Sequence, residues 1–162
     1  MTDKTEKNIR FICDDNLGRL ARYLRAAGFD TVWERSISDS QLIRVALDEN
    51  RCILTRDRRL AAMTLARNVF LIEPDNWREQ LHSVLRHYEL TINRNAMFVR
   101  CLEDNAMTIT VAKESIRGLV SPFTYETHDN FRQCPLCRRV YWSGTHVAAI
   151  SGRFKSLGLI AE

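Results

Sequence analysis

The sequence predicts an α/β fold, a three-layer sandwich around a central mostly parallel sheet, followed by a small β module. Across the first half of the chain, short apolar runs typical of strands alternate with amphipathic helical patterns. Such alternation implies right-handed crossovers, which place helices on both faces of a mostly parallel sheet. After about residue 90 the helical periodicity disappears and short β-like segments replace it. This change in character predicts a second, smaller unit.

Four strands and four helices are expected in the first half. The strands are expected at 10–13, 31–33, 52–55 and 69–72, each as a short apolar run. The helices are expected at 17–27, 39–50, 58–67 and 76–88, each with apolar residues on one face. Gly28 is the predicted C-terminal stop of the first helix. Ser38 or Asp39 is the predicted cap of the second helix.

The second part of the chain is expected to be rich in β structure. It contains the strand-like segment 108–111, and residues 113–120 are expected to form one brief helix that stops near Pro122. The tail from residue 146 onwards has an ambiguous pattern. The predicted division is therefore a first domain at 8–90, a β module at 93–146 and a C-terminal tail at 147–162.

Composition is that of a globular protein and excludes several classes. The 162 residues are 45% hydrophobic and 27% charged, which allows a sizeable core. The net charge of +4 is compatible with an anionic partner but does not identify one. No run of 18 apolar residues predicts a membrane span, and no apolar leader is visible near Met1. The odd count of five cysteines argues against a secreted disulfide framework and favours a cytoplasmic protein.

Aspartates occur where the predicted fold would bring them together. Asp14 and Asp15 follow the first strand, Asp57 follows the third strand, and Asp39 opens the helix between them. In an open parallel sheet, residues just past the carboxyl ends of neighbouring strands converge on one crevice. Carboxylates gathered there repel one another unless a cation or shared protons hold them, and hard oxygen ligands suit Mg²⁺ or Mn²⁺. We therefore predict a divalent-metal site with Asp14, Asp39 and Asp57 as ligands.

Several neighbouring residues are candidates for supporting roles. Asp15 and Asp75 are second-line candidates for the acidic cluster, and the Thr55 hydroxyl is expected beside the metal or its water. Arginines that flank the acids are candidate contacts for phosphate groups. They are Arg56, Arg58 and Arg59 beside Asp57, and Arg19, Arg22 and Arg25 along the first helix. The simpler alternatives are that Asp39 and Asp57 only cap helices and that the arginines form a solvent-facing basic side.

The same acids also occur in a different class, the phospho-accepting receiver domains. There, two acids after the first strand bind Mg²⁺ and a lone Asp after the third is phosphorylated. That class should carry a Lys-Pro pair after a fifth strand, and this chain contains no Lys-Pro. The receiver interpretation is therefore disfavoured.

A second constellation is built on cysteines. Cys134 and Cys137 form a C-x-x-C pair, which in a cytoplasmic chain indicates half a zinc site or a redox pair. A redox pair should follow an early strand and open a helix, and this segment does neither. Upstream, Cys101 is followed three residues later by Asp104, whose carboxylate oxygen can ligate zinc. The alternatives left open are a degenerate ribbon with weak or no metal, and His128 or His146 as the fourth ligand.

The sequence as a whole resembles the Mut-seven C-terminal RNase domain family, in which a PIN-like domain is followed by a zinc ribbon. The matching segments lie at 10–14, 17–25, 28–30, 39–42, 53–57, 80–81, 100–101, 105, 131, 134–137 and 139–146. The resemblance covers roughly residues 10 to 146. It departs from the family pattern at Asp104, where the family has its second ribbon cysteine.

The resemblance implies a metal-dependent ribonuclease that hydrolyses RNA phosphodiester bonds. It implies that Asp14, Asp39 and Asp57 hold the Mg²⁺ or Mn²⁺, and that the zinc ribbon helps to position RNA or a partner. A metal-bound water is expected to attack the phosphorus while arginines grip the backbone. Two rival hypotheses remain: a non-catalytic RNA- or ribosome-binding module, and a toxin-like nuclease controlled by a protein partner.

Overall fold

The computed structural model describes residues 9–63 and 68–160. The chain divides into two compact units, one formed by Met1–Leu24 with Phe29–Glu89 and the other by Arg25–Gly28 with Leu90–Glu162. Within the described ranges, no helix is both long enough and apolar enough to cross a membrane. Residues 64–67, the end of one expected helix, and the N-terminal residues searched for a leader lie outside these ranges.

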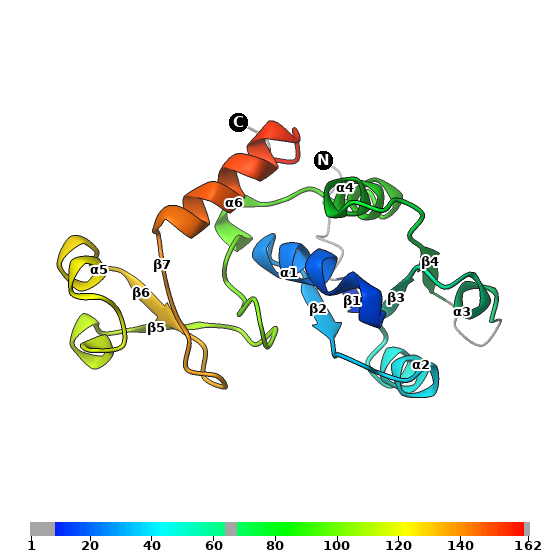
Figure 1. Ribbon diagram of the computed structural model, residues 1–162, viewed down its shortest axis with the longest axis horizontal. Helices are drawn as coiled ribbons and strands as arrows, with labels where there is room; N and C mark the ends of the chain where they lie inside the picture. Colours follow the sequence, from blue (N-terminus) through cyan, green and yellow to red (C-terminus); the bar gives the residue numbers. More distant parts are fainter. Residues whose placement is uncertain (1–8, 64–67, 161–162) are drawn as a thin grey trace, which may run out of the picture. The chain divides into compact units, whose positions relative to one another are not determined.

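The first unit is built on a parallel sheet of four strands (Figure 1). The strands are β1 (Arg10–Cys13), β2 (Asp30–Trp33), β3 (Cys52–Thr55) and β4 (Val69–Leu71), in the order β2-β1-β3-β4. In the centre of the sheet, Ile12 of β1 lies opposite Val32 and Ile53. Because every pairing is parallel, the carboxyl ends of all four strands lie at one edge.

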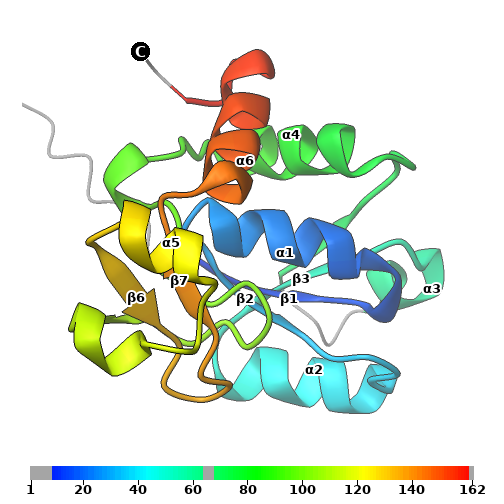
Figure 2. The same cartoon turned by 60° about the vertical axis from the view of Figure 1, so that its left-hand side comes forward.

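Helices cover both faces of this sheet (Figures 1 and 2). They are α1 (Gly18–Ala26), preceded by the short 3₁₀ turn η1 (Asp15–Leu17), and α2 (Asp39–Asp48), α3 (Arg58–Ala62) and α4 (Trp77–His87). α1 and α4 lie on one face, and α2 and α3 lie on the other. The predicted three-layer α/β sandwich is confirmed.

The core follows from the alternation of side chains along the strands. On one face, Ile12 and Ile53 pack against Leu42 and Ala46 of α2 and Leu60 of α3. Residues next to them in the strands point to the opposite face, where α1 and α4 lie. Fully burying one such aliphatic side chain contributes about 1.5–3 kcal/mol. This packing fixes where each helix begins, and the helix starts carry the candidate acids.

Asp39 and Asp57 differ in whether they cap a helix. Ser38 caps α2, because its hydroxyl accepts from the Gln41 N–H while the Gln41 side chain accepts from the Ser38 N–H. Asp39 is therefore the first residue of the helix rather than its cap. Asp57 does cap α3, because its carboxylate accepts from the Arg59 N–H at 2.7 Å. Asp39 is thus available for another role, and Asp57 already has a structural one.

The second unit contains an antiparallel sheet of three strands in the order β5-β6-β7. The strands are β5 (Ile109–Val111), β6 (Phe131–Gln133) and β7 (Val140–Trp142). The helical segments are η2 (Arg94–Ala96), η3 (Lys113–Ile116), α5 (Pro122–Thr127) and α6 (Thr145–Ser156). The predicted small β module is confirmed.

Two helical predictions in this unit were wrong. The expected helix at 113–120 is only the short turn η3, and Pro122 opens α5 instead of ending a helix. Proline suits the first helical position because its missing N–H would have no partner there, and Ser121 caps the helix by accepting from the Thr124 N–H. The ambiguous tail forms α6, whose Phe154 is fully buried.

Gly28 ends α1 in a left-handed conformation. Its φ is +98°, its N–H donates to the Arg25 carbonyl, and the Phe29 N–H donates to the Leu24 carbonyl. These two bonds form a Schellman motif, so the predicted stop at Gly28 is confirmed. A Cβ at Gly28 would also lie 2.4 Å from the carbonyl oxygen of Ala96.

We therefore expect Gly28→Ala to destabilise the protein more than Gly118→Ala. Both glycines have positive φ, but a Cβ at Gly118 meets no atom within 4 Å. Gly118→Ala should cost about 1–2 kcal/mol from conformation alone, and Gly28→Ala should cost about 1–3 kcal/mol more from the clash. The free energies of unfolding from denaturant titrations measure both. Equal losses would show that the close approach to Ala96 contributes nothing.

Candidate functional site

The first candidate site lies at the carboxyl edge of the parallel sheet. The chain runs from β1 outwards to β2 and then returns to place β3 on the other side of β1. This reversal between β1 and β3 is the point at which open α/β sheets form a ligand crevice. Asp14 follows β1, Asp57 follows β3, and the Asp14 N–H donates to the Leu54 carbonyl at 2.9 Å. Two of the predicted acids therefore flank the switch point.

Thr55 connects these two acids. Its side chain is fully buried at the end of β3. Its hydroxyl donates to Asp14 Oδ2 at 2.9 Å and accepts from the Asp57 N–H, also at 2.9 Å. A hydroxyl has one hydrogen to donate, and here Thr55 donates it to the Asp14 carboxylate. Thr55 thus holds the Asp14 carboxylate in register with the backbone of Asp57.

Both carboxylates keep acceptor capacity for a cation. Asp14 accepts a second bond, from the Asp15 N–H to Oδ1 at 2.7 Å, and Asp57 accepts from the Arg59 N–H through Oδ1. A carboxylate offers about four acceptor positions, so neither group is saturated. Their hard oxygens are the donors that Mg²⁺ and Mn²⁺ prefer. The residues present fit such an ion chemically.

The remaining predicted acids lie near the same edge but are not gathered with Asp14 and Asp57. Asp39 is exposed in the first turn of α2. Asp15 accepts from the Ser36 N–H at 3.0 Å, so its carboxylate anchors the segment that follows β2. Across residues 9–63 and 68–160, Asp14, Asp39 and Asp57 are not a group whose ligand atoms all lie within 4.8 Å of one another. Their role as joint metal ligands stays a prediction.

The predicted phosphate-binding arginines are on the surface, with one exception. Arg19, Arg22, Arg56 and Arg58 are exposed, and Arg56 pairs with the exposed carboxylate of Asp75. Such a pair contributes little to stability and is easily exchanged for another anion. Arg25, expected on the same basic stripe, was misplaced by that prediction. Its side chain is buried and donates to carbonyls of the second unit.

Trp77, at the start of α4, lies against two arginines, of which the sequence analysis selected Arg19 but not Arg78. Tyr23 stacks on its ring at 3.6 Å between centroids. The guanidinium groups of Arg19 and Arg78 lie 5.6 and 4.9 Å from the centroid of the Trp77 ring. Cation–π attraction of this kind is worth about 0.5–1 kcal/mol at an exposed site. The adjacent Trp77 and Arg78 at a helix start were the available sequence signal for Arg78.

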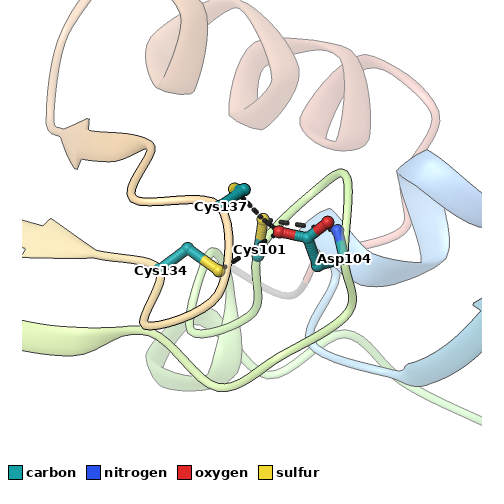
Figure 3. A group of neighbouring side chains, drawn as sticks. All are labelled: Cys101, Asp104, Cys134 and Cys137. Carbon is teal, nitrogen blue, oxygen red and sulfur yellow. Dashed lines mark hydrogen bonds between the residues drawn. The ribbon is translucent and has the colours of Figure 1, made fainter.

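The second candidate site is a cluster of four side chains in the second unit (Figure 3). It consists of Cys101, Asp104, Cys134 and Cys137, whose ligand atoms all lie within 4.8 Å of one another. Among the residues that the structure describes, this is the group of cysteine, histidine and acidic side chains that could hold a metal ion. His128 and His146 do not belong to it, so Asp104 supplies the fourth ligand position.

The distances match a tetrahedral ion. The sulfur atoms of Cys101 and Cys137 are 3.7 Å apart, and Asp104 Oδ2 lies 3.5 Å from the Cys101 sulfur and 3.3 Å from the Cys134 sulfur. Around tetrahedral zinc, with bonds of about 2.3 Å to sulfur and about 2.0 Å to oxygen, the corresponding separations are about 3.8 and about 3.5 Å. These three separations are close to the tetrahedral values, and the other pairs of ligand atoms lie within 4.8 Å of one another. The cluster could bind a metal such as zinc.

The two loops that carry the ligands have the same backbone geometry. In the first, the Cys101 N–H donates to the Ala106 carbonyl at 2.8 Å and the Asn105 N–H donates to the Cys101 carbonyl at 3.0 Å. In the second, the corresponding bonds join Cys134 to Arg139 at 2.9 Å and Arg138 to Cys134 at 3.1 Å. Asn105 and Arg138 both have φ of 65°. Asp104 thus occupies in its loop the position that Cys137 occupies in the other.

Protonation in the cluster follows from the contacts between thiols and the carboxylate. Hydrogen bonds from Cys137 first, and also from Cys134 and Cys101, lower the pKa of Asp104. Desolvation among its neighbours, with the hydrogen bond to Asp104, raises the pKa of Cys137 to about 12. Without metal, the Cys137 thiol therefore holds its proton beside the Asp104 carboxylate. Metal binding at a cysteine site displaces such protons, because the ligand is the thiolate.

Buried groups from other segments hold the first ligand loop in place. The Arg25 guanidinium donates to the carbonyls of Leu102 and Glu103, at 2.9 and 2.7 Å, between the two ligands of that loop. Tyr141 accepts from the Leu102 N–H at 3.0 Å, and its hydroxyl lies 3.1 Å from the Cys101 sulfur. Burial raises the pKa of Tyr141, so its hydroxyl stays protonated beside that sulfur. Supports of this kind orient metal ligands.

Comparison with known proteins identifies one family. A family model described as "Mut7-C RNAse domain" matches residues 9–154, nearly the whole chain. Comparisons with curated proteins and with solved structures give no match.

We expect the purified protein to contain one metal ion per chain at the cysteine cluster, and Asp104 to be needed for it. Asp104→Ala should lower metal affinity by roughly two orders of magnitude, because about 10–16 kcal/mol of binding is shared among four ligands. Asp104→Cys should restore or strengthen binding. Elemental analysis and competition with a chromogenic chelator measure both effects. Glu103→Gln, a charge change at the neighbouring position, is the control, and equal retention by Asp104→Ala would exclude the carboxylate as a ligand.

Proposed function

Because the chain belongs to the Mut7-C RNAse domain family, we propose that it is a metal-dependent ribonuclease that hydrolyses RNA phosphodiester bonds. The observation that carries this proposal is the bridge from Asp14 through the Thr55 hydroxyl to the Asp57 N–H, at the switch point of the sheet. A buried hydroxyl there fixes the half-buried Asp14 carboxylate beside the backbone of Asp57. It is what a metal site at this edge needs.

In the proposed site, Asp14, Asp39 and Asp57 hold Mg²⁺ or Mn²⁺, with Asp15 as an additional acid. A bound ion of this kind activates water and neutralises charge that develops on phosphoryl oxygens. Asp39 is exposed, so its side chain can turn towards Asp14 without disturbing buried packing. Asp57 can keep its cap on α3 through Oδ1 and offer its other oxygen to the ion. Thr55 is a positioning residue, since its hydroxyl is engaged by the two aspartates.

The arginines near this edge would bind the RNA backbone. Arg19, Arg22, Arg56 and Arg58 are exposed and can present guanidinium groups to phosphates in bidentate fashion. Arg56 would exchange its ion pair with Asp75 for a phosphate. Binding of this type is electrostatic and carries no sequence information. The proposal therefore specifies the chemical class of the substrate, RNA, without a sequence preference.

For the second unit we propose that the bound metal is zinc and that its role is structural. Three thiolates and one carboxylate in a closed tetrahedron leave no open coordination position for a substrate. None of the five cysteines, all in the described ranges, forms a disulfide, which suits a reducing compartment such as the cytoplasm. The zinc-bound module would help to position RNA or a protein partner.

We expect Asp14→Asn and Asp57→Asn each to lower RNA cleavage by at least two orders of magnitude, which corresponds to about 2.7 kcal/mol of activation free energy. Each variant removes one negative charge from the proposed ion while keeping the shape of the side chain. The assay is cleavage of labelled RNA with Mn²⁺, and Asp48→Asn at the exposed end of α2 is the matched control. Activity removed by chelator should return with Mn²⁺ and not with Zn²⁺. RNA retained but never cleaved by the wild-type protein would favour a non-catalytic binding module.

We expect Thr55→Val to weaken the response to Mn²⁺ as well as the fold. Loss of the hydroxyl leaves the Asp57 N–H without its acceptor and Asp14 without a donor, at a cost of about 1–3 kcal/mol. Thr55→Ser keeps the hydroxyl and should keep both properties close to wild type. The readouts are the free energy of unfolding and the Mn²⁺ concentration that gives half-maximal cleavage. A purely structural Thr55 would change the first and leave the second unmoved.

A further inference from the structure

The second unit contains a pocket separate from its metal cluster. Its volume is about 760 Å³, within the range of about 300–1,000 Å³ typical of small-ligand sites. One side is formed by the strands β5, β6 and β7, and another by α6 and the segment around η2. Its lining includes none of the candidate acids, the arginines near the sheet edge or the ligands of the metal cluster. Tyr141 lines the pocket and also contacts the cluster through its hydroxyl.

Aromatic residues contribute to the lining of the pocket, and two of them are held in place by neighbouring groups. Phe98, Tyr141 and Trp142 contribute to its lining. The Trp142 ring folds against Gly144, where even a Cβ would lie 2.4 Å from the indole nitrogen. The Tyr141 hydroxyl is held by the Leu102 N–H. The rings of Tyr141 and Trp142 therefore lose little conformational freedom when a ligand contacts them.

The charge of the pocket is positive. Arg94 and Lys155 are exposed at its lining, and Arg132 also contributes. Arg132 is fixed across the sheet, because its guanidinium donates to the hydroxyl and carbonyl of Thr108 and to Thr110 Oγ1. Of the described residues that line the pocket, none is an aspartate or glutamate. A ligand that suits this lining combines a flat ring system with negative charge.

We propose that this pocket binds one nucleotide of single-stranded RNA, with its base against the aromatic lining and its phosphates near Arg94 and Lys155. Stacking on aromatic side chains and backbone contacts to cations are the two components of single-strand binding. A base within a duplex is already stacked and cannot enter, so the site selects unpaired RNA. The choice of RNA rests on the proposed function, whereas the pocket and its charge do not depend on catalysis. The second unit thus supplies a holding site for substrate.

Gly152 on α6 allows the pocket to be filled without removing any contact. It lines the pocket, and a Cβ built there meets no atom within 4 Å. Gly152→Phe should therefore occupy the space of the base, while Gly152→Ala should leave it open. Both variants are introduced into the full chain carrying Asp14→Asn, so that RNA is bound and not cut. Fluorescence anisotropy with a labelled oligouridylate measures the affinity.

We expect Gly152→Phe to weaken oligouridylate binding about tenfold or more, the size of one lost stacking contact. Gly152→Ala should change the affinity by less than about twofold, because the added methyl reaches no partner. A hairpin of the same length should bind more weakly than the oligouridylate, and uridine monophosphate should compete only at high concentration. Equal affinities of the Phe and Ala variants, or equal binding of hairpin and single strand, would overturn the proposal.

A second pair of variants tests the charge and does not depend on filling the pocket. Lys155→Gln removes a cation of the pocket lining, and Arg153→Gln removes one from the same last turn of α6 that is not part of the lining. Lys155→Gln should reduce the salt dependence of binding by about 0.7 in log–log slope, and Arg153→Gln should not. Equal slopes for the two variants would contradict the assignment. If the wild-type protein cleaves RNA but Gly152→Phe does not change the affinity for oligouridylate, the proposed role of the pocket is wrong and the nuclease proposal still holds.

Discussion

Parallel pairing of all four strands is the constraint on which the first unit depends. It forces every connection to cross a face of the sheet, so each strand ends at the same edge and each helix begins near it. The return of the chain from β2 to β3 across β1 then opens a crevice between two strand ends. Asp14 and Asp57 lie there because of where β1 and β3 stop, and Thr55 turns that adjacency into a defined hydrogen-bonded arrangement.

The second unit achieves order by a different route, because its sheet has only three short strands. Two loops with matching hydrogen bonds present four ligand atoms to one point, and each loop contains a residue with φ of 65°. Arg25 and Tyr141 fix the first loop from outside. In a unit with so small a sheet, a metal ion bound at this cluster would supply a cross-link in place of a larger apolar core.

Periodicity predicted the three-layer fold because strands and helices of the first unit obey their local patterns. The Gly28 stop and the ligand set of Cys101, Asp104, Cys134 and Cys137 were also visible in residue types and spacing. Arg25 could not be placed that way, because its spacing with Arg19 and Arg22 says nothing about which segment covers the end of α1. Likewise, the pocket beside α6 could not be predicted, because it is formed by segments that are far apart in the sequence. In addition, the sequence pattern of the tail that forms α6 was ambiguous. Contacts between distant segments cannot be predicted from local sequence periodicity.

The carboxylate at Asp104 has a consequence for which ions the cluster admits. Soft, monovalent copper strongly favours sulfur, whereas an oxygen donor favours borderline and harder divalent ions. A centre with one oxygen in place of a fourth sulfur is therefore a poorer trap for Cu⁺ than a full set of cysteines, while its separations remain suited to zinc. The Asp104 loop has the same backbone hydrogen bonds as the loop that carries Cys137, so in a metal-bound centre this one side chain would set the resistance to binding the wrong metal.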